Sequence, residues 1–101
     1  MVAACPWLSQ ATAEAFLGGV VTASNCDFTR GQDSLHIEVS ERLAACPNAK
    51  PLKSIGTEAF TCGDDLIVGR VRDKAFLVRL KTKEPREKVR KIAELVAGSL
   101  F

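Results

Sequence analysis

The chain has 101 residues, four cysteines, one histidine and a small net charge of +2. Its length is that of a single domain, residues 1–101, and a domain of this size buries only about two thirds of the surface that its unfolded chain exposes. No apolar run reaches the ~18 residues that a transmembrane helix needs, which excludes a membrane span within these residues.

The cysteines are spaced too widely for a typical zinc site. The closest neighbours, Cys46 and Cys62, are sixteen positions apart and His36 is the only histidine, whereas zinc ligands usually come as close pairs. Two disulfides are therefore expected among Cys5, Cys26, Cys46 and Cys62, with free buried thiols as the alternative. Each bridge would contribute about 3 kcal/mol. Paired cysteines predict an oxidising, extracytoplasmic location: a periplasm, a cell surface or the medium.

No secretory signal peptide is recognisable after Met1, since neither a basic segment nor an apolar core follows it. Val2-Ala3-Ala4-Cys5 resembles a bacterial lipobox, in which the cysteine becomes lipidated. Lipidation of Cys5 would leave an odd number of thiols, so the parity of the cysteines favours a disulfide at this position.

The first expected element is a short amphipathic helix that follows Ser9, whose hydroxyl can cap it, and ends at Gly18. Its apolar face consists of Ala13, Phe16 and Leu17. Residues 25–29 then predict a strand, and residues 30–33 a turn. Residues 34–40 predict a second strand, because Leu35, Ile37 and Val39 alternate with polar residues.

Residues 41–45 could form one helical turn, and residues 46–51 are expected to form a loop. Three strands follow, at residues 58–62, 66–72 and 75–81, the last two joined by a tight turn at Asp73-Lys74. A final helix is expected from Pro85 to just before Gly98. The order predicts an α+β fold, with an antiparallel sheet of about five strands and both helices on one face.

Four cysteines can pair in three ways. Bridges between sequence neighbours suit this layout best. Cys5 with Cys26 would tie the first helix to the first strand, and Cys46 with Cys62 would tie the irregular link to the third strand.

Cys5-Pro6-Trp7-Leu8-Ser9 stands before an expected helix that ends in Leu17-Gly18-Gly19, and Cys26-Asp27-Phe28 follows. This arrangement resembles the opening of small secreted or lipid-anchored bacterial envelope domains, chiefly actinobacterial. Ile55-Gly56-Thr57-Glu58-Ala59 is similar to the central GxGDEA-like segment of these domains, with Thr57 where an acidic residue is common. Related modules are extracytoplasmic sensors of receptor-type serine/threonine kinases. The resemblance implies a cystine-stapled binding or sensing domain and supplies no catalytic residue.

No catalytic constellation is recognisable in the sequence. His36 shares the polar face of its strand with Glu38, but no nucleophile is tied to this pair by a motif. Gly63-Asp64-Asp65 is typical of a turn and lacks the alternating oxygen ligands of a calcium loop. The protein is therefore expected to be no enzyme and to use no metal and no cofactor.

Charge is distributed unevenly along the chain. Residues 1–69 carry four basic and eight acidic side chains, and residues 70–101 carry ten and four. Four basic residues could share one sheet face and form an anion-binding patch: Arg70, Arg72, Arg79 and Lys81. Nucleic acid is not an expected partner, because the aromatic residues fall mostly at expected core positions.

These observations favour a noncatalytic binding or sensing domain whose partner is a small ligand or an envelope protein. The alternative is an assembly module that binds another envelope protein through a sheet edge. The basic patch adds a further possibility, which is binding to anionic lipid or to a wall polymer.

Overall fold

The first helix forms where its capping residues predict it. The computed structural model describes residues 5–43, 46–53 and 55–100 and places α1 at Gln10–Leu17. The Thr12 N–H donates a 3.1 Å hydrogen bond to the Ser9 hydroxyl at the N-cap, and Gly18 ends the helix with a left-handed φ of 87°. Ala13 and Leu17 are buried, as the spacing of the apolar residues predicts.

Replacing Ser9 with alanine is expected to lower the free energy of unfolding by about 1 kcal/mol, because it removes the acceptor for the Thr12 N–H. Urea denaturation measures this change. Ser24→Ala is the matched control, since Ser24 is an exposed serine on an edge strand, and it should change stability by less than about 0.5 kcal/mol. Equal losses from the two substitutions would show that the cap contributes nothing.

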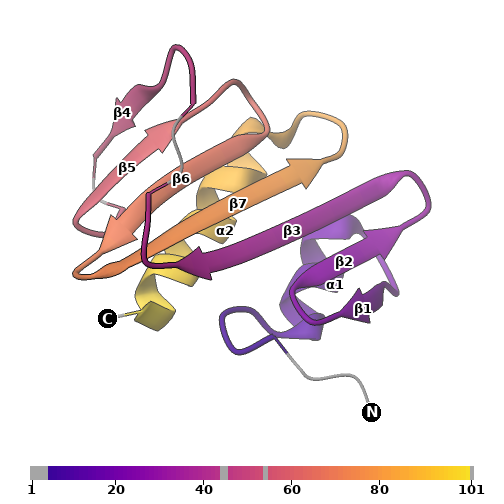
Figure 1. Cartoon of the computed structure of the whole chain (residues 1–101). Coiled ribbons are helices and arrows are strands. Elements are labelled where there is room, and N and C mark those ends of the chain that lie inside the picture. Colours follow the sequence, from indigo (N-terminus) through magenta and orange to yellow (C-terminus); the bar gives the residue numbers. More distant parts are fainter. Residues whose placement is uncertain (1–4, 44–45, 54, 101) are drawn as a thin grey trace.

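Within the described residues, seven strands form one antiparallel sheet in the order β1-β2-β3-β7-β6-β5-β4 (Figure 1). The connections from β1 to β2, from β2 to β3, from β5 to β6 and from β6 to β7 are short, and the link between β3 and β4 is the exception. The strands are β1 (Thr22–Ser24), β2 (Asp27–Arg30), β3 (Asp33–Ser40), β4 (Lys50–Leu52), β5 (Glu58–Thr61), β6 (Leu66–Val71) and β7 (Lys74–Lys81).

Both helices cover the same face of the sheet. In Figure 1 they lie behind it, with α1 behind β1 to β3 and α2 (Pro85–Leu100) behind the strands at the other end. The buried stripe of α2 meets the sheet residues that alternate toward it, among them Phe76, Val78 and Leu80 of β7. The stripe consists of Val89, Ile92, Ala93, Val96 and Ala97. This layer of side chains is the hydrophobic core. We call the other face, which neither helix covers, the open face, although Val68 and Ala75 on it are only 2% exposed and the chain after β3 crosses in front of it (Figure 1).

The expected sheet of about five strands is corrected to seven, because β1 and β4 were not foreseen. Each has three residues, too few for an alternating pattern, and each exists only through its pairing with a neighbour. Asn25, expected in a strand, has a φ of 54° and belongs to the turn between β1 and β2. Pro51 favours a loop at this position in the sequence, but proline is tolerated on an edge strand such as β4.

Three boundaries also differ from expectation. The two-residue turn before β7 is Arg72-Asp73, because Val71 pairs with Lys74. Helix α2 continues through Gly98, which lies in open space on its surface. Residues 41–43 are not helical, and Ala44 and Ala45, the rest of that expected turn, lie outside the described residues.

Both expected disulfides are confirmed. Cys5 is bonded to Cys26, and Cys46 to Cys62. The sulfur of Cys5 is therefore occupied, while Val2 to Ala4 of the lipobox-like segment lie outside the described residues. Of the two helices in the described chain, neither combines the length and the apolar character that crossing a membrane requires.

Candidate ligand-binding pocket

A pocket of about 500 Å³ opens at the β4 end of the sheet, on the side covered by the helices. The strand register explains which sheet side chains form the bottom of the pocket, called its floor below. Lys50 is paired with Thr61 and Thr61 with Ile67, so these side chains stand in one row, and Ile67 belongs to the core that faces the helices. The lining comes from three separate segments: Asn48, Lys50 and Leu52; Thr61, Gly63, Asp64 and Ile67; and Arg86 and Arg90.

The Cys46–Cys62 disulfide holds two of these segments together. Asn48 follows Cys46 by two residues, and Gly63 and Asp64 follow Cys62 directly. The turn after Cys62 is closed by further bonds, since the Cys62 N–H donates to the Leu66 carbonyl at 2.8 Å and the Thr61 hydroxyl donates to the Gly63 carbonyl at 2.7 Å. The disulfide therefore sets the rim of the pocket as well as stabilising the chain.

The charges around the pocket are mainly positive. Lys50, Arg86 and Arg90 contribute three cations and Asp64 one carboxylate. The Arg86 guanidinium donates to Oδ1 of Asp64 from Nη2 at 2.9 Å and from Nε at 3.1 Å, so these two charges offset each other. The other two cations of the lining, Lys50 and Arg90, have no carboxylate partner within the lining.

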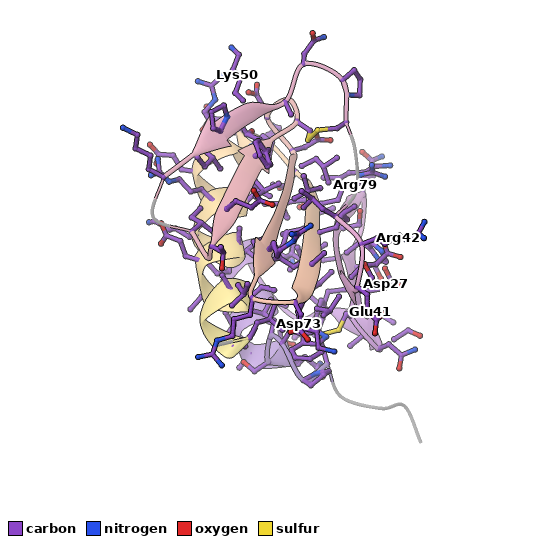
Figure 2. The ribbon with its side chains drawn as sticks, turned by 60° about the vertical axis from the view of Figure 1, so that its left-hand side comes forward. Asp27, Glu41, Arg42, Lys50, Asp73 and Arg79 are labelled. Atoms are coloured by element: carbon purple, nitrogen blue, oxygen red, sulfur yellow. A yellow bond between two sulfur atoms is a disulfide. The ribbon has the colours of Figure 1, made fainter. Side chains whose placement is uncertain are left out.

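These two cations differ in their neighbours. Nε of Arg90 lies 3.8 Å from a carboxylate oxygen of Glu94, one turn further along α2, and both side chains are about half exposed. Lys50 makes no ion pair within the part of the chain that the structure describes. Figure 2 shows Lys50 at the top of the molecule, far from the labelled acidic residues Asp27, Glu41 and Asp73.

A second hollow adjoins the pocket at the start of α2. It shares Asp64 and Arg86 with the pocket, and its other lining residues are Glu84, Pro85, Glu87 and Lys88. Three carboxylates and two cations make this hollow acidic on balance. The Arg86–Asp64 ion pair therefore lies between a positive region toward β4 and a negative region toward the helix start.

The structure divides the expected basic patch. Arg70, Arg79 and Lys81 lie on the open face of the sheet, because their strand positions alternate with the residues that face the helices. Arg72 is in the β6–β7 turn with a φ of 57°. Nε of Arg70 lies 3.8 Å from a carboxylate oxygen of Glu58.

An apolar row separates the parts of this patch. Arg70 is paired with Ala75 and Arg79 with Leu66, so the two arginines stand four residues, or about 13 Å, apart along the strands. Between them, Val68 is paired with Leu77 and is only 2% exposed although it points away from the helices. The cations of the open face are thus scattered around apolar residues.

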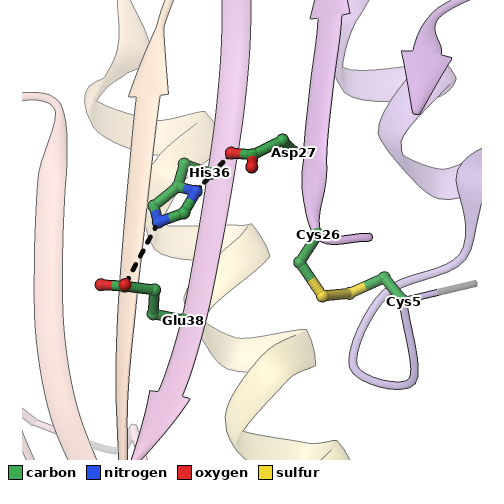
Figure 3. A network of polar contacts seen from close by, with 5 residues as sticks. All are labelled: Cys5, Cys26, Asp27, His36 and Glu38. Carbon is green, nitrogen blue, oxygen red and sulfur yellow. Dashed lines mark hydrogen bonds and ion pairs between the residues drawn. A yellow bond between two sulfur atoms is a disulfide. The ribbon is translucent and has the colours of Figure 1, made fainter. Parts of the chain in front are cut away.

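The single histidine lies between two carboxylates on the open face (Figure 3). Nδ1 of His36 contacts Oδ1 of Asp27 on β2, and Nε2 lies 3.7 Å from Oε1 of Glu38. Arg79 is its register partner on β7. The nearby Cys26 is disulfide-bonded and offers no thiol nucleophile. In the residues described, no cluster of three His, Cys, Asp or Glu side chains is suited to hold a metal ion.

Sequence reasoning did not find the pocket. The local pattern indicates a loop at Lys50 and a turn at Asp64, and it marks Arg86 and Arg90 only as part of the basic C-terminal third. A signal was present in the cysteines, because the expected Cys46–Cys62 bridge already brought Asn48 and Lys50 near the turn after Cys62. The contribution of α2 depends on the helix position over the sheet, which no local pattern encodes.

Comparison of the chain with protein-family models, with curated proteins and with solved structures gave no match. The class of protein is therefore defined by its own architecture. Over the residues that the structure describes, it is a disulfide-stapled α+β domain with a seven-stranded antiparallel sheet and a cationic pocket at the edge of its core layer. Two disulfides in so small a domain are typical of proteins in oxidising environments.

Proposed function

We propose that this protein is a noncatalytic extracytoplasmic binding or sensing domain of a bacterial cell envelope, and that its ligand occupies the pocket between β4, β5 and α2. The pair of disulfides supports the location. The resemblance of the Cys5 to Ser9 and Ile55 to Ala59 segments to envelope domains supports both the location and the role as a sensor.

The pocket is the observation that carries the proposal. Ligand sites are typically concave, with an apolar surface and a few convergent polar groups, and a volume of about 500 Å³ lies in their usual range. Here Leu52 supplies apolar surface above the buried Ile67, and Lys50, Asp64 and Arg90 supply charge from three different segments. The His36 cluster has carboxylates on both ring nitrogens and no adjoining cavity among those described, which favours binding over catalysis.

A fragment screen by NMR on the isotope-labelled, oxidised chain tests this proposal. Fragments that bind are expected to shift the backbone amide resonances of Leu52, Thr61, Ile67 and Arg90, since ligands concentrate where several polar groups meet apolar surface. Fragments that bind only at the open face, near Leu77 and Arg79, or nowhere on the protein, would contradict the assignment of the ligand site.

A second candidate function is assembly through a sheet edge, and the contrast between the two edge strands favours β1. Strand β4 carries Lys50 and Pro51, residues that discourage edge pairing, whereas β1 carries neither. Val20, just before β1, is 83% exposed. If β1 docks a partner strand, Ala23→Pro should abolish complex formation while the monomer stays folded. A complex unaffected by this substitution would eliminate the β1 edge.

A further inference from the structure

We propose that the pocket recognises an acidic amphiphile, a ligand that carries a phosphate or carboxylate group beside a short apolar chain. This inference rests on the proposed binding function and names the chemical class of its ligand. The acidic group would lie between Lys50 and Arg90, and the apolar chain would lie over Leu52. The argument comes from the charges, the floor and the size of the pocket.

The charges select an anion. Of the three cations in the lining, only Arg86 is neutralised from within the pocket, by Asp64. Arg90 has a single long contact with Glu94, through Nε, and Lys50 has no ion-pair partner among the described residues. An ammonium and a guanidinium that converge on one hollow suit a phosphate or carboxylate, which can accept charge-assisted hydrogen bonds from both.

The floor selects an apolar group next to that anion. Leu52 is half-buried and exposes part of its apolar side chain, whereas Ile67 is only 2% exposed and closes the floor beneath it. The one hydroxyl in this row, that of Thr61, already donates to the carbonyl of Gly63 at 2.7 Å. A sugar or another polar ligand would therefore find few donors on the floor, whereas an alkyl chain would remove apolar surface from water.

The open face is a poorer anion site than the pocket. Arg70 is near Glu58, and Arg79 is the register partner of His36, which Asp27 and Glu38 flank. The apolar residues Val68 and Leu77 lie between the cations there, and neither of the two hollows described above is lined by these cations. Of these two regions of the described chain, the pocket is the one that combines positive charge with a concave apolar surface.

Binding of octyl phosphate to the oxidised full chain tests the ligand class, with calorimetry for affinity and NMR amide shifts for location. Octyl phosphate should bind at the pocket about tenfold tighter than inorganic phosphate, which lacks the chain, and than octyltrimethylammonium, which has the opposite charge. Octanoate should behave as octyl phosphate does if charge alone selects the head group. Binding of octyl phosphate should weaken as salt is raised.

Substitutions that each remove one positive charge test where the anionic group of the ligand binds. Lys50→Gln and Arg90→Gln should each lower the affinity for octyl phosphate about fivefold. Lys74→Gln, in the β6–β7 hairpin, and Arg79→Gln, on the open face, remove the same charge outside the pocket and should leave affinity unchanged. Thermal unfolding of all four variants checks that each remains folded.

The outcomes separate the two proposals. If octyltrimethylammonium binds the pocket as tightly as octyl phosphate, or if inorganic phosphate does, the pocket remains a binding site but the acidic amphiphile is the wrong class. If octyl phosphate shifts only open-face amides and Arg79→Gln weakens it, the basic patch is the anion site and the pocket assignment fails. If no probe shifts pocket residues, both the ligand class and the proposed site are overturned.

Discussion

Replacing Cys46 and Cys62 together with alanine is expected to lower the free energy of unfolding by about 3 kcal/mol, because the bridge closes a loop with a sequence separation of 16 residues. The same change should weaken octyl phosphate binding about tenfold, since the segments that carry Asn48 and Asp64 would lose their tether. Urea denaturation and calorimetry measure the two effects.

Removal of the other disulfide is the matched control. Cys5→Ala with Cys26→Ala opens a loop with a sequence separation of 21 residues and should also cost about 3 kcal/mol. That bridge lies at the opposite end of the sheet from β4, so affinity at the pocket should stay the same in the folded fraction. If both double variants lose affinity equally, the Cys46–Cys62 bridge has no special role in shaping the pocket.

Replacing Gly69 with alanine is expected to destabilise the fold by about 3 kcal/mol, through overpacking at the centre of the sheet. A Cβ at this position would lie 2.5 Å from Cζ of Phe76 and 2.7 Å from the Glu58 carbonyl oxygen. The ring can move only by disturbing the core, and the carbonyl belongs to the backbone of β5. Both contacts must therefore shift, and thermal or urea unfolding will show the loss.

Gly98→Ala provides the control with the same chemical change. A Cβ on Gly98 meets nothing within 4 Å, and the residue lies inside α2. Alanine should raise stability by about 0.5 to 1 kcal/mol there, because glycine is the poorer helix former. A small effect at Gly69, comparable in size to that at Gly98, would mean that β5 and β7 can separate enough to admit a methyl group.

The long elements could be predicted because their signals are local. Ser9 and Gly18 bound α1 through hydrogen bonds and a left-handed turn that depend on neighbouring residues alone. The alternation of Leu35 and Ile37 in β3 likewise indicates which face of that strand is buried. The stripe from Val89 to Val96 does the same for α2. The cysteine pairing followed once these elements were in order.

The short elements could not be predicted in the same way. A three-residue strand such as β1 or β4 has no period of its own, and its backbone is extended only because a neighbour supplies hydrogen bonds. Gly98 was expected to end α2, yet the helix passes through it, since the adjacent Val96 and Ala97 are buried against the sheet and offset the poor propensity of glycine.

The sequence by itself determined a disulfide-stapled α+β domain with one helix at each end of a mainly antiparallel set of strands, because capping, alternation and cysteine parity are properties of nearby residues. The pocket was decided only by the tertiary structure. Its charges come from Lys50, Asp64, Arg86 and Arg90, on segments that meet through the β4–β5 register, the Cys46–Cys62 bond and the packing of α2. Those are long-range contacts, and no single stretch of the chain encodes them.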